Sequence, residues 1–123
     1  MTEIFDDHEL LLRAVYPADR NPNFWKGDRI SSAAFKDKKG LSVSRTGDRS
    51  LAESVSVVKE RFTGFIVSVT VPQCRDVGAF IKYLPISDDK YHSEIHNSQD
   101  VPLLDNRKAK LLARAAIIQY SPI

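Results

Sequence analysis

The segment from Ser50 to Gly64 constrains the fold most, because it carries a complete set of helix signals. Ser50 and Glu53 have the spacing of a capping box, in which the hydroxyl accepts from the Glu53 amide and the carboxylate accepts from the Ser50 amide. Gly64 stands where a left-handed residue ends many helices. Between these signals, four apolar residues recur at helical spacing: Leu51, Val55, Val58 and Phe62. The pattern predicts a helix over about residues 50–63.

A strand pattern follows this helix directly. Residues 65–71 alternate so that every second side chain is large and apolar, as in a strand with one buried face. Two further segments, 77–84 and 91–97, are bounded by turn-forming residues and predict strands. The short connections between these three predict an antiparallel meander. The apolar run 11–16, stopped by Pro17, predicts another strand, with a short helix as the alternative.

The remaining segments complete an α+β domain. Residues 30–35 and 41–44 are interpreted as a hairpin around a polar turn that ends in Gly40. A second helix is predicted over about residues 106–119, capped by Asp105 or Asn106. We therefore expect a single α+β domain over residues 1–123, with a mainly antiparallel sheet and both helices packed on one of its faces.

Charge and cysteine usage narrow the classes of partner. The chain has 18 basic and 16 acidic side chains and a formal net charge of +2, so we do not expect a nucleic-acid partner. Cys74 is the only cysteine, and a lone thiol suits a reducing cytosol. The acidic N-terminus lacks the apolar core of a signal peptide, and no apolar run approaches the roughly 20 residues that span a bilayer. We expect a cytoplasmic protein without a membrane partner.

The sharpest local group of candidate site residues is His92, Glu94 and His96. On a strand these three side chains share one face, where imidazole and carboxylate groups suit either a metal ion or acid–base chemistry. Neighbours at this spacing lie roughly 7 Å apart, so a shared ion would need a further ligand, such as His8 or Asp100. The alternative is a solvated strand face, and we expect neither a metal nor another cofactor.

Arg13 is the second candidate, because it is a charged residue in an apolar strand. Such a side chain is either paired as a structural anchor or turned toward a pocket for an anionic ligand. The serines Ser42 and Ser44 follow it in the chain, and then Glu94. This order resembles the arginine, Ser-x-Ser and glutamate layout of some ADP-ribosyltransferase-like enzymes, in which the arginine holds the dinucleotide and the glutamate polarises the ribose. The chain departs from that layout at His92, where the family often has Glu or Gln.

Phe24 and Trp25 are the candidate binding residues for a protein partner. They lie in a loop of turn-forming residues, and aromatic side chains are enriched at binding hot spots. The alternative is that both rings fill gaps in the core.

Several short segments resemble an uncharacterised family of small bacterial proteins: LRAVYP at 12–17, SSAAFK at 31–36, LSV at 41–43 and YH at 91–92. The resemblance implies a freestanding bacterial domain and carries no activity or ligand. Because the chain has no phosphate loop, zinc-knuckle spacing or nucleophile elbow, the sequence favours a non-enzymatic interaction module that docks to another macromolecule, most simply a protein. The alternative is a small enzyme, metal-dependent or ADP-ribosyltransferase-like, that uses Arg13, His92 and Glu94 on a phosphate-containing or nucleotide substrate. The sequence does not fix the oligomeric state.

Overall fold

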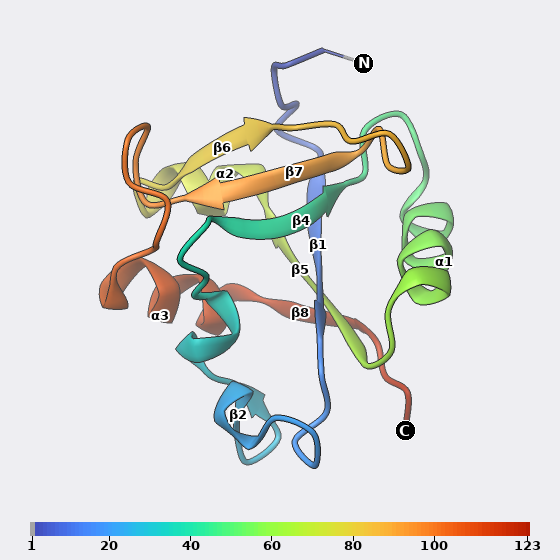
Figure 1. Ribbon diagram of the computed structural model, residues 1–123, viewed down its shortest axis with the longest axis vertical. Helices are drawn as coiled ribbons and strands as arrows, with labels where there is room; N and C mark the ends of the chain where they lie inside the picture. Colours follow the sequence, from blue (N-terminus) through green and yellow to red (C-terminus); the bar gives the residue numbers. More distant parts are fainter. Residues whose placement is uncertain (1) are drawn as a thin grey trace.

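A computed structural model describes residues 2–123, and its central feature is a six-stranded sheet in the order β6-β7-β4-β1-β5-β8 (Figure 1). All neighbouring strands are antiparallel. The elements follow one another as β1 (Leu10–Val15), the 3-10 helix η1 (Pro22–Phe24), β2 (Trp25–Lys26), β3 (Arg29–Ile30), the 3-10 helix η2 (Ser32–Phe35), β4 (Leu41–Arg45), α1 (Leu51–Arg61), β5 (Phe65–Thr70), α2 (Val71–Asp76), β6 (Phe80–Tyr83), β7 (His92–His96), α3 (Asn106–Ala115) and β8 (Ile117–Tyr120). The chain is therefore a single α+β domain.

The predicted capping box begins α1. The Ser50 hydroxyl accepts from the Glu53 amide at 3.1 Å, and the Glu53 carboxylate accepts from the Ser50 amide at 3.4 Å. The predicted apolar stripe is only partly buried, because Val58 lies in the core while Leu51 and Phe62 are 37% and 54% exposed. The end of the helix that carries Phe62 therefore leaves apolar surface open to solvent.

The helices cover both faces of the sheet, so the prediction that they share one face is wrong. Side chains alternate along β1: Leu11 joins the larger core with Leu112 of α3, whereas Leu12 joins a smaller core with Val58 of α1. Figure 1 shows α1 and α3 on opposite sides of the central strands. Apolar residues at consecutive positions of β1 are what a strand covered on both faces requires.

The C-terminal helix ends four residues earlier than predicted. Asp105 caps α3 by accepting from the Lys108 amide at 2.8 Å, and the helix stops at Ala115. The following residues, Ile117–Tyr120, form the edge strand β8 beside β5. Isoleucines are β-branched, and the open edge of β5 gives their backbone a partner that a continued helix would not use.

The predicted meander is also wrong. β5 lies between β1 and β8, and β6 lies at the far edge of the sheet beside β7. A second capping box between Thr70 and Gln73 starts helix α2 directly after β5 and carries the chain away from that strand. Pro72 falls in the first turn of α2, where proline is tolerated, and β6 consequently begins at Phe80 rather than at residue 77.

The predicted hairpin of residues 30–35 with 41–44 is replaced by a smaller one. β2 and β3 pair around a turn in which Gly27 has φ +64°. Residues Ser32–Phe35 form η2, whose Ala34 and Phe35 are fully buried in the larger core. Within residues 2–123, no helix is long and apolar enough to cross a membrane.

Candidate functional site

The central strands β1 and β4 separate after two residue pairs, and this separation opens the sheet. Their shared register ends at Leu12 and Ser44. Beyond that point the two strands are no longer paired with each other: β1 stays beside β5, and β4 stays beside β7 (Figure 1). A continued register would place Ala14 opposite Ser42, but the two residues are not paired.

Arg13 fills the gap between the separating strands. Its Nε donates to the Ala34 carbonyl at 3.3 Å, and its Nη1 donates to the Ser42 carbonyl at 3.2 Å. Burial lowers the pKa of Arg13 from its ordinary value, and the negative charge of Asp37 partly opposes this shift. Two of its donors are thus bound to backbone carbonyls, one in η2 and one in β4, which is the behaviour of a structural anchor.

A groove of about 270 Å³ lies over this opening, and we call it the splay groove. Its floor comes from β1 and β4, one wall from the C-terminal end of α1, and the other wall from the loop between β6 and β7. Most of its exposed lining surface is apolar, although seven of the fifteen lining residues are polar or charged. The lining consists of Leu12, Arg13, Ala14, Tyr16, Phe24, Ser42, Val43, Ser44, Val58, Arg61, Phe62, Thr63, Ile86, Asp89 and His92. A concave, mainly apolar surface with a few convergent polar groups has the character of a binding site.

Ser42 and His92 are the polar pair in this groove. The His92 Nδ1 lies 2.9 Å from the Leu84 carbonyl oxygen, so this nitrogen carries the proton of the neutral ring. The other ring nitrogen, Nε2, is then an acceptor and faces the Ser42 hydroxyl at 3.4 Å. The groove therefore presents one hydroxyl and one basic nitrogen side by side.

His92, Glu94 and His96 share a strand face but do not gather at one point. The Glu94 carboxylate pairs with the His96 Nε2 at 2.8 Å, while His92 turns toward the splay groove. A Cβ at Gly40 would lie 2.4 Å from that same His96 nitrogen, so the loop before β4 closes over the pair. Within residues 2–123, no group of three or more His, Cys, Asp or Glu side chains is placed to hold a metal ion, and the suggested further ligands His8 and Asp100 join no such group.

The residues of the ADP-ribosyltransferase-like layout lie close together but have other partners: Ser42 on β4 pairs with Glu94 on β7, and Arg13 donates to the Ser42 carbonyl. Arg13 is bound to backbone carbonyls, and Glu94 is paired with His96. The Ser44 hydroxyl accepts from Arg49 at 3.1 Å. Arg13 and Ser42 both line the splay groove, but Glu94 does not.

Phe24 and Trp25 are both half-buried and have different surroundings. Trp25 donates from Nε1 to the Tyr16 carbonyl at 2.8 Å, and its ring lies 4.7 Å from that of Phe65. These contacts fix the indole against the domain. Phe24 lines the splay groove and is the member of the pair that a ligand there would touch.

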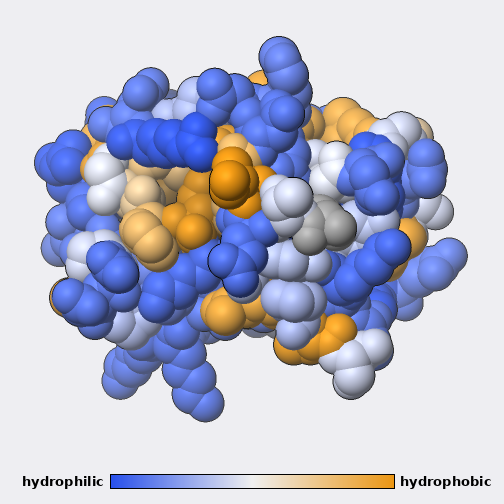
Figure 2. All heavy atoms as spheres, turned by 90° about the horizontal axis from the view of Figure 1, so that it is seen from above, coloured by the Kyte–Doolittle hydropathy of each residue, from blue (hydrophilic) through white to orange (hydrophobic). Residues whose placement is uncertain are grey.

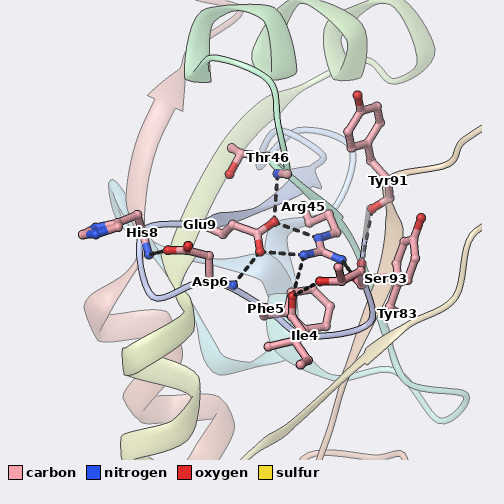
Figure 3. A network of polar contacts seen from close by, with 12 residues as sticks. Ile4, Phe5, Asp6, His8, Glu9, Arg45, Thr46, Tyr83, Tyr91 and Ser93 are labelled. Carbon is pink, nitrogen blue, oxygen red and sulfur yellow. Dashed lines mark hydrogen bonds and ion pairs between the residues drawn. The ribbon is translucent and has the colours of Figure 1, made fainter.

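A buried ion pair between Glu9 and Arg45 is the main feature that the sequence did not reveal (Figure 3). Arg45 Nε and Nη2 donate to the two carboxylate oxygens at 2.7 and 2.6 Å, and the amides of Asp6 and Gly47 donate to them at 2.8 Å. Burial by itself would raise the pKa of Glu9, but the hydrogen bonds and the charge of Arg45 outweigh it and hold that pKa below its ordinary value of 4.5. The partners are 36 residues apart, so no local spacing could have indicated them.

Arg45 also ties down the N-terminal segment. Its Nη1 and Nη2 donate to the carbonyls of Thr2 and Ile4 at 2.6 and 3.2 Å, and the guanidinium lies 4.1 Å from the centre of the Phe5 ring and 4.9 Å from that of Tyr83. Figure 3 shows the segment wrapped around the pair. The buried polar atoms of Glu9 and Arg45 all have hydrogen-bond partners within the protein. This network therefore stabilises the fold and leaves few free donors or acceptors for a ligand.

The fold and this geometry define an α+β protein whose antiparallel sheet opens into a mainly apolar groove. No protein-family model, curated protein or solved structure matches the chain.

Proposed function

We propose that the protein is a small, non-enzymatic interaction module that receives an apolar side chain of a protein partner in the splay groove. The observation that carries this proposal is the exposure of large apolar residues around that groove. Tyr16, Phe62 and Ile86 are 43%, 54% and 48% exposed, and all three line it. Apolar surface buried on binding contributes roughly 25 cal/mol per Å², so such a rim favours association.

The character of the rim favours a protein over a small molecule. The groove of about 270 Å³ is smaller than the roughly 300–1,000 Å³ of typical small-molecule pockets, whereas a peptide segment would cover its floor and both walls. Figure 2 shows, on one face of the molecule, how apolar groups interrupt a largely hydrophilic surface. The Ser42 hydroxyl and the His92 Nε2 add polar contacts that would orient a backbone or a polar side chain of the partner.

The test is site-specific photo-crosslinking in cells that make the protein. A photoreactive phenylalanine analogue at position 62 should form one dominant adduct with another protein. The same analogue at Ile117, which is 60% exposed on β8 and outside the groove, is the matched control. Substitution of Ile86→Ser should abolish the adduct at position 62. Adducts of equal yield at both positions, or an adduct that survives Ile86→Ser, would refute the proposal.

One observation favours a second candidate, a small enzyme acting through Ser42. The Ser42 hydroxyl faces the His92 Nε2 at 3.4 Å, and the other ring nitrogen is oriented by the Leu84 carbonyl. In an acyl transfer, Ser42 Oγ would attack the acyl carbon, His92 would take its proton, and that proton would pass to the leaving group. A fluorophosphonate probe should then label the wild-type protein but not Ser42→Ala or His92→Gln, and absence of labelling on the wild type removes this candidate.

The proposal includes a cytoplasmic location and a bacterial source. The buried, single thiol of Cys74 supports the first, and the resemblance of the short sequence segments supports the second.

A further inference from the structure

A second concave surface, of about 410 Å³, lies between the β2–β3 hairpin and α3. Lys26 and Arg29 line it from the hairpin, and Lys110 and Arg114 line it from the helix. Lys110 and Arg114 are four residues apart, so they lie on the same side of α3. Ser32 is also part of the lining. We call this surface the basic pocket.

The four cations of the basic pocket are uncompensated. None of them makes an ion pair with any of residues 2–123, and no acidic residue lines the pocket. Asp28 is in the turn of the same hairpin but outside the lining. The chain as a whole has 16 acidic against 18 basic residues, so the concentration of one sign here is local. Like charges around a concavity repel one another and raise the local concentration of anions.

We propose that the basic pocket binds a compact, multiply charged phosphate ligand, such as a di- or triphosphate group. Two guanidinium groups offer the forked geometry that matches phosphate oxygens, and two ammonium groups add point charges. The ligand enters a concavity bounded by two elements, which suits a compact polyanion. This site is separate from the splay groove, since the two share no lining residue.

Isothermal titration calorimetry of the full chain with inorganic tripolyphosphate, at an ionic strength of about 0.15 M so that distant charges are screened, tests this site. The wild type should give saturable binding, and orthophosphate should bind more weakly because it carries fewer charges. The double variant Lys110→Gln with Arg114→Gln removes two charged hydrogen bonds, each worth about tenfold in affinity, so binding should weaken about 100-fold. These side chains are exposed, and circular dichroism should show an unchanged fold.

The matched control removes two charges elsewhere. Lys59→Gln with Lys90→Gln changes the net charge equally, and neither residue lines the basic pocket. This control should bind tripolyphosphate within about twofold of the wild type, because long-range charge effects are small beside direct contacts. Absence of saturable binding, or equal weakening in both double variants, overturns the proposal. A single-stranded oligonucleotide is the last probe. If it binds more tightly than tripolyphosphate and depends equally on Lys110 and Arg114, the proposal of a compact ligand is wrong and the pocket binds a nucleic-acid backbone.

Discussion

Substitution of Glu9→Gln should destabilise the fold strongly, because it leaves a buried arginine without its counter-charge. The side chains of Arg45 and Glu9 are 2% and 5% exposed. Removing one partner of such a pair costs about 3–5 kcal/mol of unfolding free energy, against a total of about 5–15 kcal/mol for a typical domain. For a chain of this length, each kcal/mol lowers the Tm by about 4 °C, so we expect a loss of about 10–20 °C.

Asp7→Asn is the matched control, because it removes a carboxylate two residues away and changes the net charge equally. Asp7 pairs with Arg75 at 2.5 Å, but the side chains of Arg75 and Asp7 are 51% and 70% exposed. A pair in contact with water contributes roughly 0–1 kcal/mol. Thermal and urea unfolding of the two variants should therefore differ clearly. If Glu9→Gln lowers the Tm no more than Asp7→Asn, the stabilising role of the buried pair is refuted.

The same pair predicts the direction of the pH dependence. The pKa of Glu9 is lower in the folded than in the unfolded chain, so the folded protein binds this proton less readily. Its contribution to stability is fully present above the unfolded pKa near 4.5 and is lost as the pH falls toward the folded pKa. The stability difference between the wild type and Glu9→Gln should hence narrow below about pH 4.5. A gap that stays constant down to acid unfolding would contradict this assignment.

One pair of substitutions and one labelling reaction test the packing of the core and of the loop before β4. Gly40→Ala should cost more stability than Gly27→Ala, because a Cβ at Gly40 would lie 2.4 Å from His96 Nε2, whereas nothing lies within 4 Å of one at Gly27. Gly27 has φ +64° and Gly40 has φ +105°, so backbone strain adds to the clash at Gly40, and equal losses in the unfolding curves of the two variants would exclude both. The Cys74 thiol should react with a thiol reagent at pH 8 only after unfolding, because burial raises its pKa to about 12. Rapid labelling of the native protein would contradict its burial.

Local signals predicted the elements that depend on neighbouring residues. The Ser50–Glu53 capping box and the strand after Gly64 are both indicated by residues within a few positions of one another. The structure confirms the helix and the strand, although β5 is buried on both faces rather than on one. The element after Ala115 could not be predicted in this way, because its backbone pairs with β5, some fifty residues earlier in the chain. The local pattern there favours a helix, but pairing with the free edge of the sheet stabilises a strand instead.

The splay groove was not predictable from the sequence for a similar reason. Ser42, His92 and Phe62 come from three segments that are distant in the sequence: Ser42 and His92 lie on the paired strands β4 and β7, and Phe62 follows α1. The sequence did single out His92, but as a partner of Glu94 and His96 on one strand face. Strand periodicity predicts on which face of the sheet a side chain lies, but it does not predict which neighbouring element that side chain contacts.

The arginines near the central strands bind backbone carbonyls, which for Arg13 is the structural-anchor alternative of the two that the sequence left open. Arg13 donates to two backbone carbonyls, Arg45 to the carbonyls of Thr2 and Ile4, and Arg49 to those of Arg45 and Thr46. Each guanidinium thus satisfies backbone acceptors where the sheet is irregular or a terminus crosses it.

The cations of the basic pocket are the opposite case. They are exposed, they make no ion pair with any of residues 2–123, and an unpaired charge there has no structural reason to face others of its own sign. A charged side chain whose donors are bound to backbone carbonyls supports the fold. A group of charged side chains whose donors have no partner in the protein is available to a ligand. This difference in partners separates the arginines of the sheet from Lys110 and Arg114 of α3, and it makes the basic pocket the stronger site for an anion.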